Sequence, residues 1–382
     1  MSTLITGGTL LTPQETLPDH TLVIDEGRIT ALEPGTRPPG RGDLVIDAAG
    51  WWVAPGMIDV HVHGAVGHDT MDATPEALHG MARFFAAHGV TGYFPTTMTA
   101  PAAAITAAVE NVRTCPQPDD GAAHLGVHLE GPYLSAAHKG AQPAAYLRDP
   151  DPAEYGPWLE SGVVRLVTLA PERDGALDLI SYGAARGVIF AAGHSGASYD
   201  QVQQAVGLGL RQATHTFSGM PGLHHRQPGL VGAALTDDRI YAQLIVDGVH
   251  IHPAVVKLAI RAKRPRRAIL ITDAIRAAGL PDGEYDLGGQ AVTVRDGVAR
   301  LDPQTLAGST LTMDAALRQV MRFAGLSLSQ ALPMATSVPA EAMNLAGRKG
   351  VLAPGADADM ILLDADLHVR LTMVSGRVVY RR

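Results

Sequence analysis

Histidines and carboxylates gather in short motifs along this chain. The first is the run 59–63, in which Asp59, His61 and His63 alternate with valines. Side chains alternate across a β-strand, so an extended run would point these three groups to the same side. Neutral imidazoles combined with a carboxylate are ligands that Zn²⁺ and Fe²⁺ accept. The run therefore predicts part of a metal site.

Four further motifs repeat the pattern of an apolar run that ends in a polar group. The residues that end them are Glu130, His194, His215 and Asp273. A single histidine of this kind is more often an ordinary core or surface group than a ligand. Their recurrence changes the interpretation, since four imidazoles and one bridging carboxylate would fill the inner shell of one or two ions.

The apolar runs that carry these residues alternate with alanine-rich helical stretches. We predict eight strands, at residues 57–63, 90–96, 125–130, 163–169, 188–193, 212–216, 241–246 and 268–272. Repeated βα units form a parallel sheet, and eight of them close a (β/α)8 barrel of the TIM type. Chemistry in such barrels lies at the carboxyl ends of the strands, where these polar residues stand.

Both ends of the chain depart from the βα pattern. Residues 1–54 hold short alternating segments separated by turns, and residues 347–382 return to strands. We expect the two ends to pair in one small β-sandwich domain beside the barrel, which would occupy residues 55–346. Within the barrel, the Asp296-Gly297 turn predicts a hairpin inserted at about residues 283–302.

Composition excludes several classes of function. With 46% hydrophobic and 18% charged residues, the chain is globular rather than disordered. A net charge of −8, with no basic cluster longer than residues 263–267, argues against a nucleic-acid partner. Each apolar stretch is interrupted before the roughly 20 residues that span a bilayer, so no membrane role is expected. One cysteine, Cys115, and an amino-terminal sequence without signal-peptide features favour a cytoplasmic location.

The motifs together resemble the metal-dependent amidohydrolase superfamily over nearly the whole chain. Within it they resemble the branch that removes the acetyl group from N-acetylglucosamine 6-phosphate. The motifs that carry the resemblance are residues 55–64 (PGMIDVHVHG), 128–133 (HLEGPY), 193–195 (GHS), 214–215 (TH), 224–229 (HHRQPG), 247–250 (DGVH), 272–274 (TDA), 306–309 (LAGS) and 350–359 (GVLAPGADAD).

The resemblance implies a set of metal ligands. Glu130, His194 and His215 would bind the main ion, and His61 and His63 with Glu130 would bind a second. The predicted fourth strand holds no lysine that could be modified to bridge two ions, so Glu130 is the expected bridge. One or two divalent ions per subunit, Zn²⁺ or Fe²⁺, are expected.

The resemblance also implies how the acetyl group is removed. Asp273 would take a proton from water activated by the metal and return it to the departing amine. Asp59 would orient a ligating histidine from behind the metal shell.

Substrate contacts follow from the same resemblance. Arg226 suits the phosphate, because a guanidinium matches phosphate geometry with two parallel hydrogen bonds. In relatives this arginine and the histidine at position 250 reach in from a neighbouring subunit, so a homodimer is expected, with Arg226 and His250 acting across its interface. The other expected contacts to an amino-sugar phosphate are Ala141, Gln142, Ser218, Gly219, Leu306, Ala307 and Gly308.

Three positions depart from the pattern of the branch. Ser218-Gly219 replaces a familiar Asn-Ala pair, Gln227 replaces a glutamate, and Gln142 replaces a histidine that polarises the acetyl carbonyl. A glutamine amide can donate a hydrogen bond but carries no charge. Alternatively, His138 takes that histidine's role. These departures leave room for another N-acylated sugar phosphate, such as the galactosamine epimer.

Two other classes of function stay open. Hydrolysis of cyclic amides or dipeptides, as by dihydroorotase or isoaspartyl dipeptidase, is disfavoured by the missing lysine and by the motif at residues 224–226. A barrel that binds a sugar phosphate without turnover is disfavoured by the presence of every metal position and of Asp273.

Overall fold

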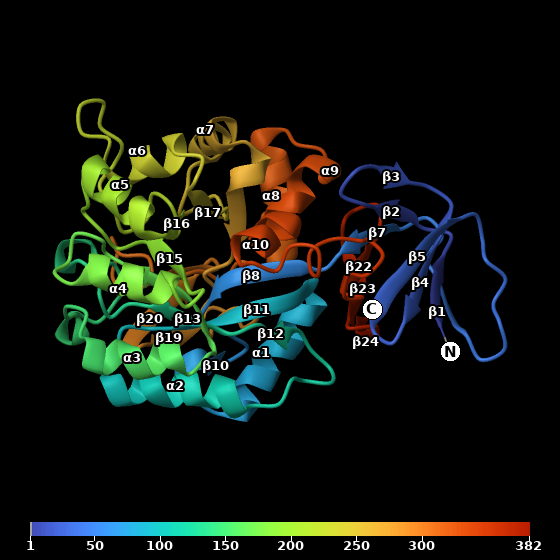
Figure 1. The fold of residues 1–382 in the computed structure, drawn as a ribbon, viewed down its shortest axis with the longest axis horizontal. Helices are drawn as coiled ribbons and strands as arrows, with labels where there is room; N and C mark the ends of the chain where they lie inside the picture. The colour runs from blue at the N-terminus through green and yellow to red at the C-terminus, as the bar shows by residue number, and fades with distance from the viewer. Residues whose placement is uncertain (1) are drawn as a thin grey trace.

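The computed structural model describes residues 2–382, and its larger part is a barrel of parallel strands (Figure 1). The strands follow one another around the barrel in chain order as β8 (Met57–Val62), β11 (Val90–Thr97), β13 (Val127–Glu130), β14 (Val164–Leu169), β15 (Ile189–Ala192), β16 (Leu210–Ala213), β17 (Tyr241–Ile245) and β18 (Ala268–Ile271). The predicted (β/α)8 barrel is confirmed.

The sixth barrel strand ends earlier than predicted. We expected a strand at residues 212–216, but β16 stops at Ala213. His215 and Phe217 adopt φ values of +27° and +85°, which lie outside the extended region that a strand requires. The chain therefore turns before His215 and carries this histidine past the strand end.

A buried carboxylate completes the barrel where β18 meets β8. The backbone N–H of Asp273 donates to the carbonyl of His61, and that of His63 donates to Ala274, both at 2.9 Å. Near these bonds, the carboxylate of Asp59 accepts a hydrogen bond of 2.5 Å from the hydroxyl of Thr272. Asp59 is 1% exposed. It links the first strand to the last within the core, so it has a clear role in closing the barrel.

Helices cover the outside of the barrel. Their bounds are α1 (Pro75–Ala87), α2 (Ala102–Thr114), α3 (Pro152–Glu160), α4 (Ala176–Ala184), α5 (Tyr199–Leu208), α6 (Gly229–Thr236), α7 (Pro253–Lys263), α8 (Met313–Ala324), α9 (Leu328–Ala331) and α10 (Ser337–Ala342). Within residues 2–382, no helix combines the length and apolar character of a membrane span.

Helix α1 illustrates how the sequence sets these helices. It begins after Thr74, whose hydroxyl accepts the N–H of Ala77, and Pro75 occupies the first helical position. Its buried residues include Leu78, Met81 and Phe85, and this spacing of three and four places them on one face. That face packs on the barrel, where the Phe85 ring lies 4.9 Å from the ring of Tyr93.

The two chain ends form two sheets beside the barrel, blue and red in Figure 1. We call residues 3–55 and 360–381 the β module. One sheet runs β5 (Arg28–Pro34), β4 (His20–Asp25), β1 (Thr3–Thr6), β6 (Leu44–Asp47). The other runs β24 (Arg377–Arg381), β23 (Val369–Val374), β22 (Met360–Leu363), β7 (Trp52–Pro55), β2 (Thr9–Leu11), β3 (Thr16–Leu17).

Strands β22 and β7 join the amino-terminal and carboxy-terminal parts of the β module. These strands are antiparallel neighbours, with Met360 opposite Pro55, and an apolar core that includes Ile5, Leu10 and Leu362 lies between the two sheets. The division into residues 1–54, 55–346 and 347–382 remains our proposal for the domain boundaries.

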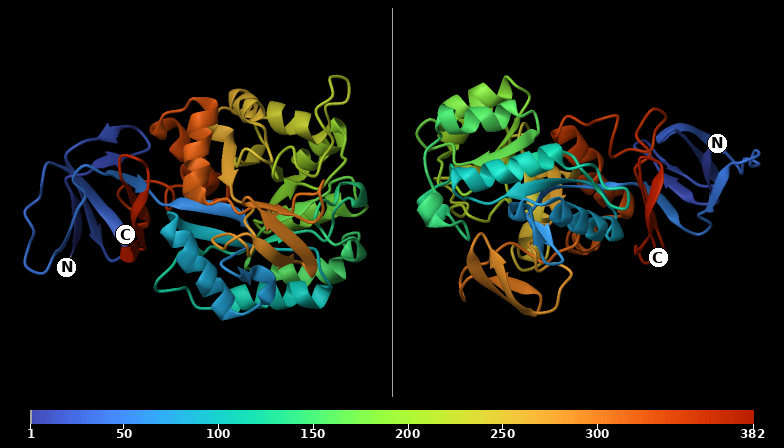
Figure 2. Two further views of the ribbon diagram at one scale, coloured as in Figure 1. Left: turned by 180° about the vertical axis from the view of Figure 1, so that it is seen from behind. Right: turned by 90° about the horizontal axis from the view of Figure 1, so that it is seen from below.

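The segment inserted after β18 has three strands rather than a single hairpin. They are β19 (Gly283–Leu287), β20 (Gln290–Arg295) and β21 (Val298–Arg300). Asp296-Gly297 connects β20 to β21 as predicted, but the turn at Gly288-Gly289 was not foreseen. Figure 2 (right) shows this sheet standing out from the barrel. Its apolar side includes Leu287, which clusters with Met98 and brings the insert to the mouth of the barrel.

Three shorter strands lie beside the barrel strands. β9 (Gly64–Ala65) and β10 (His68–Asp69) form a small antiparallel pair just after the first barrel strand, and β12 (Ala123–His124) pairs with β11.

Candidate metal centre and substrate cavity

A cavity of about 310 Å³ opens at the carboxyl ends of the barrel strands. The residues that line it are His63, Met98, Glu130, Gly140, Ala141, Gln142, His194, His215, Ser218, Gly219, His250, Asp273, Leu287, Gln304, Thr305, Leu306 and Gly308. This is the position where barrels of this type carry out chemistry.

Glu130, His194 and His215 form one candidate group of metal ligands. The Oε1 atom of Glu130 lies 3.1 Å from the Nε2 atoms of both histidines, and those two nitrogens are 3.1 Å apart. All three residues are buried. The structure thus brings together the three residues expected to hold the main ion.

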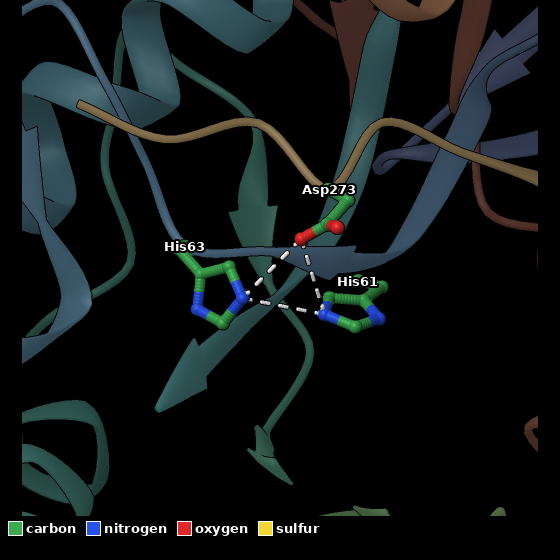
Figure 3. A group of neighbouring side chains, drawn as sticks. All are labelled: His61, His63 and Asp273. Carbon is green, nitrogen blue, oxygen red and sulfur yellow. Dashed lines mark hydrogen bonds and ion pairs between the residues drawn. The ribbon is translucent and has the colours of Figure 1, made fainter. Parts of the chain in front are cut away.

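His61, His63 and Asp273 form a second group (Figure 3). The Nε2 atoms of the histidines are 3.3 Å apart, and the Oδ1 atom of Asp273 lies 3.4 Å from His61 and 3.3 Å from His63. His61 lies in β8, His63 follows the last residue of that strand, and Asp273 comes from the segment after β18. The sequence had assigned Asp273 only a proton-transfer role, so its place among these ligands is new.

Glu130 also reaches the second group. Its Oε2 atom lies 3.2 Å from Nε2 of His63, and its Oε1 atom lies 3.5 Å from Nε2 of His61. One carboxylate is thus within reach of all four imidazoles, which is the geometry that a bridging ligand requires.

The donor set fits a divalent cation. The Nδ1 atom of His194 lies 2.9 Å from the carbonyl of His138, and Nδ1 of His63 lies 3.2 Å from the carbonyl of Thr96. A carbonyl only accepts, so each Nδ1 carries a proton, and Nε2 is the nitrogen that each neutral imidazole would offer to a metal ion. The Nε2 atoms of His61 and His215 also point to this centre, so a cation placed there would meet four imidazole nitrogens and the carboxylate of Glu130. Such backing of ligating histidines by carbonyls is typical of metal sites.

Both carboxylates of the centre are ionised at neutral pH. Burial alone would raise the pKa of Glu130 and of Asp273, but the neighbouring imidazoles outweigh burial and hold both pKa values below their usual range. For Asp273 the stabilising groups are His61 and His63. An ionised carboxylate can accept a proton, so Asp273 is suited to act as a base.

The backbone is strained where the ligands leave their strands. His194, His215 and Asp273 have φ values of +47°, +27° and +51°, a region that costs non-glycine residues about 1 kcal/mol or more each. Each of these residues follows a barrel strand closely, so the sharp turn aims its side chain toward the centre.

Strand β14 holds no lysine and places a hydroxyl beside Glu130. Thr168 pairs in register with Glu130. Its Oγ1 atom lies 2.7 Å from Nε2 of His128 and 2.7 Å from Oγ1 of Thr214. His128 is therefore committed to a buried network beneath the ligands, and Glu130 alone spans the two groups.

Most of the expected substrate contacts line the cavity. Ala141, Gln142, Ser218, Gly219, His250, Leu306 and Gly308 all do so. Ala307 does not: it is fully buried and packs with the apolar cluster under the insert. Its two neighbours, Leu306 and Gly308, line the cavity instead.

Arg226 lies outside the cavity of its own chain. It belongs to an exposed loop at residues 221–227, and its Nη1 atom lies 2.7 Å from Nε2 of His225. By contrast, His250 lines the cavity and is held by Asp247, whose Oδ2 atom lies 2.6 Å from its Nδ1. None of the described residues lining the cavity is a lysine or an arginine.

His138 does not take the place of the missing loop histidine. Its ring lies beside Gly196, where a Cβ would come within 2.9 Å of His138 Nε2, and it does not line the cavity. What His138 contributes is its carbonyl, which orients His194. Asp59 likewise accepts the backbone N–H of His61, at 3.2 Å, rather than a ring nitrogen.

Several cavity residues escaped the sequence analysis. Met98, Leu287, Gln304 and Thr305 line the cavity, and Thr96 orients His63 through its carbonyl. None of these residues belongs to a motif of the family resemblance: Met98 and Leu287 contribute apolar surface, and Thr96 contributes its carbonyl. The position of Thr96 at the end of a predicted strand was the available clue.

Comparison with known proteins agrees with this geometry. Residues 52–379 match the model of the amidohydrolase family. The chain belongs to that family, whose members use bound metal to hydrolyse carbon–nitrogen bonds.

Individual relatives are more specific. The chain is 41% identical to the N-acetylglucosamine-6-phosphate deacetylase of Vibrio furnissii, covering 95% of this chain and 91% of the relative. It is 40% identical to the N-acetylgalactosamine-6-phosphate deacetylase of Escherichia coli O157:H7, covering 97% of each. The structure of a mutant N-acetyl-D-glucosamine-6-phosphate deacetylase from Mycobacterium smegmatis, in complex with N-acetyl-D-glucosamine-6-phosphate, superposes with a TM-score of 0.90. It is 37% identical and the match covers 99% of both chains.

Proposed function

We propose that this chain hydrolyses N-acetylglucosamine 6-phosphate to acetate and glucosamine 6-phosphate. The observation that carries the proposal is the position of the Asp273 carboxylate, which lies 3.3 and 3.4 Å from two imidazoles beside Glu130 in the lining of the cavity. Hydrolysis of an unactivated amide needs both a metal and a base at one point. The full-length similarity to deacetylases of amino-sugar 6-phosphates supports the choice of substrate.

We assign the metal to Zn²⁺ or Fe²⁺, with one or two ions per subunit, because imidazole and carboxylate ligands suit both metals. Glu130, His194 and His215 would hold one ion, and His61 and His63 with Glu130 would hold a second. A divalent ion in this place polarises an amide carbonyl and allows water to ionise near neutral pH.

Asp273 moves the protons of the reaction. Held between His61 and His63, its carboxylate accepts a proton from the attacking water. It then donates that proton to the amide nitrogen as the carbon–nitrogen bond breaks. The sugar therefore leaves as an amine rather than as an amide anion, which is far too basic a leaving group.

The phosphate needs a cation that the cavity of a single chain does not supply. The described residues lining the cavity include His250 but neither arginine nor lysine, while Arg226 projects on an exposed loop. We propose a homodimer in which Arg226 of one subunit binds the phosphate in the cavity of the other. A bidentate guanidinium suits this role. His250 lines the cavity of its own chain, so we propose that it binds the phosphate there and not, as was expected, across the interface.

We also propose a cytoplasmic location. Cys115 is the chain's only cysteine, so no intramolecular disulfide can form. This agrees with a reducing compartment.

Substrate preference tests the proposal directly. We expect kcat/KM for acetate release from N-acetylglucosamine 6-phosphate to exceed that from unphosphorylated N-acetylglucosamine by more than about 100-fold, or roughly 3 kcal/mol. The protein would be stripped of metal and refilled with Zn²⁺ or Fe²⁺. Equal or absent activity on the two sugars would refute the proposed substrate.

A complementation experiment tests the origin of the phosphate ligand. Arg226→Ala should raise KM for the phosphorylated sugar, and Asp273→Asn should be inactive. If Arg226 serves the neighbouring subunit, co-expressed Arg226→Ala and Asp273→Asn chains form mixed dimers with one intact site, and activity returns. If Arg226 serves its own subunit, every site in the mixture is defective and no activity is recovered.

N-acetylgalactosamine 6-phosphate is a second candidate substrate. The relative from Escherichia coli O157:H7 is named for this epimer and is 40% identical to this chain, against 41% for the glucosamine enzyme of Vibrio furnissii. The shortened pair Ser218-Gly219 lies in the cavity wall, where the sugar would be sensed. Measuring both epimers in the same assay decides between them.

A further inference from the structure

The side-chain amide of Gln142 has no free N–H to offer a substrate. Its Oε1 atom accepts the backbone N–H of Thr99 at 2.8 Å, and its Nε2 atom donates to Oε2 of Glu130 at 2.7 Å. The second hydrogen on Nε2 is directed to the sulfur of Met98 at 3.7 Å. Gln142 lines the cavity but is only 3% exposed.

We infer that Gln142 is a positioning residue whose amide fixes the carboxylate of Glu130 between the two groups of metal ligands. This role belongs to the metal-dependent function proposed above and replaces the expectation that Gln142 polarises the acetyl carbonyl.

The direction of the amide is set by the backbone. An N–H can only donate, so the N–H of Thr99 requires the oxygen of Gln142 on its side. The NH₂ group is then forced toward Glu130. A reversed amide would oppose two donors at Thr99 and two acceptors at Glu130, so the structure admits a single orientation.

Glu130 needs such a restraint. The last torsion of a glutamate side chain joins tetrahedral and planar carbons, so its intrinsic preference is broad. Bridging requires Oε1 to face His194 and His215 while Oε2 faces His63, as the distances of 3.1, 3.1 and 3.2 Å show. The hydrogen bond from Gln142 to Oε2 selects this rotation before any metal binds.

The loop that carries Gln142 is itself anchored by the inserted sheet. Gln290 of β20 donates to the carbonyl of Ala141 at 2.6 Å, and the N–H of Gln142 donates to the carbonyl of Lys139 at 2.9 Å. The insert therefore fixes the backbone of the loop, while the amide of Gln142 acts on Glu130. These two contributions can be separated by mutation.

Metal affinity measured without substrate tests the inference. Gln142→Met keeps the length of the side chain but removes the donor. We expect the Kd for Zn²⁺, from competition with a chromogenic chelator, to rise by about 10- to 100-fold, the usual effect of removing a group that supports a metal ligand. With saturating Zn²⁺, kcat should fall while KM for N-acetylglucosamine 6-phosphate stays within about three-fold.

Gln290→Met is the matched control. It makes the same chemical change next to the same loop but leaves the amide on Glu130, so we expect its Kd for Zn²⁺ to stay within about two-fold of the wild-type value. Equal weakening in both variants would mean that loop displacement is responsible, and the inference would be wrong. It would also be wrong if Gln142→Met raised KM and left the Kd for Zn²⁺ unchanged, since Gln142 would then contact substrate.

A second variant covers the case in which the metal-free Gln142→Met protein does not fold. Gln142→Asn retains an amide, but its side chain is shorter by one methylene and cannot reach both Thr99 and Glu130. We therefore expect this variant to bind Zn²⁺ as weakly as Gln142→Met does. Wild-type Zn²⁺ affinity in Gln142→Asn would overturn the inference. Because the affinity is measured without a sugar, failure of the proposed substrate leaves this test valid.

Discussion

The metal centre and the β module are built on opposite principles. The metal centre combines left-handed backbone at His194, His215 and Asp273 with buried carboxylates and with Nδ1 atoms of His61 and His215 that have no hydrogen-bond partner among residues 2–382. The β module encloses a core of apolar side chains, among which Leu10, Leu22, Met360 and Leu362 are fully buried.

The difference shows where the free energy of folding comes from. Each strained residue at the metal centre costs about 1 to 3 kcal/mol, whereas a fully buried aliphatic side chain contributes about 1.5 to 3 kcal/mol. The geometry of the metal centre is therefore imposed by the rest of the barrel and does not stabilise itself. Mutations in the two regions should separate activity from stability.

The largest loss of activity with little loss of stability is expected at Asp273. Asp273→Asn should lower kcat by about 10³-fold, or about 4 kcal/mol in activation free energy, because the proton acceptor is lost. Asparagine tolerates the φ of +51° at this position, so the Tm of the metal-free protein should change little. Steady-state kinetics and thermal unfolding of the same preparation measure both effects.

Asp273→Ala provides the control for Asp273→Asn. It removes the same proton acceptor but tolerates the left-handed backbone less well, so it should lose equal activity and some stability in addition. More than a tenth of wild-type kcat in Asp273→Asn would show that another group acts as the base.

The opposite behaviour is expected in the β module. Leu362→Ala removes a fully buried side chain from its core and should lower the free energy of unfolding by about 3 kcal/mol. At a temperature where the variant is folded, kcat should equal the wild-type value. Val378→Ala, at a residue that is 41% exposed in the same sheet, should cost less than about 0.5 kcal/mol. A large fall in kcat for Leu362→Ala would show that the β module contributes to activity as well as to stability.

A smaller effect, which depends on pH, is expected at Asp314 of α8. Burial alone would raise the pKa of Asp314. The hydrogen bond from His88, at 3.0 Å, and the Arg318 guanidinium outweigh burial and hold this pKa below its usual range. A depressed pKa in the folded state stabilises the protein above the unfolded value of 3.8, and this contribution disappears as the pH falls below it.

Asp314→Asn should therefore lower the free energy of unfolding by about 1 to 2 kcal/mol at pH 6. Denaturant unfolding of metal-free wild-type protein and variant should converge as the pH falls below 3.8. A difference that stays constant between pH 6 and pH 3 would show that the carboxylate charge contributes nothing to stability.

The parts of the fold that follow local patterns could be predicted from the sequence. Barrel strands appear as short apolar runs, and most of their predicted bounds agree with the structure to within one or two residues, as for β17 (Tyr241–Ile245). The predicted end of β16 was wrong because no residue type near His215 indicates that this histidine adopts a left-handed φ. The third inserted strand was missed because Gly288-Gly289 makes a turn within a stretch that was assigned to one hairpin.

For the candidate site, residue types indicated the metal ligands but not the groups that orient those ligands. His61, His63, Glu130, His194 and His215 converge, since the ends of parallel barrel strands necessarily meet. The carbonyls of Thr96 and His138 could not be anticipated, because every residue has a carbonyl and only the fold selects which one faces an imidazole. Gln142 was expected at the site, but its commitment to Glu130 depends on a backbone N–H 43 positions away in the chain.

The pairing of β22 with β7 has a consequence for synthesis on the ribosome. Met360 lies opposite Pro55, so about 300 further residues must be synthesised before β7 can pair with β22. At about 5 to 20 residues per second this takes roughly 15 to 60 s. During that interval the nascent chain presents an unsatisfied strand edge, the kind of surface that recruits other strands. The barrel is translated within this interval, so chaperones that bind nascent chains have their longest opportunity at the first 55 residues.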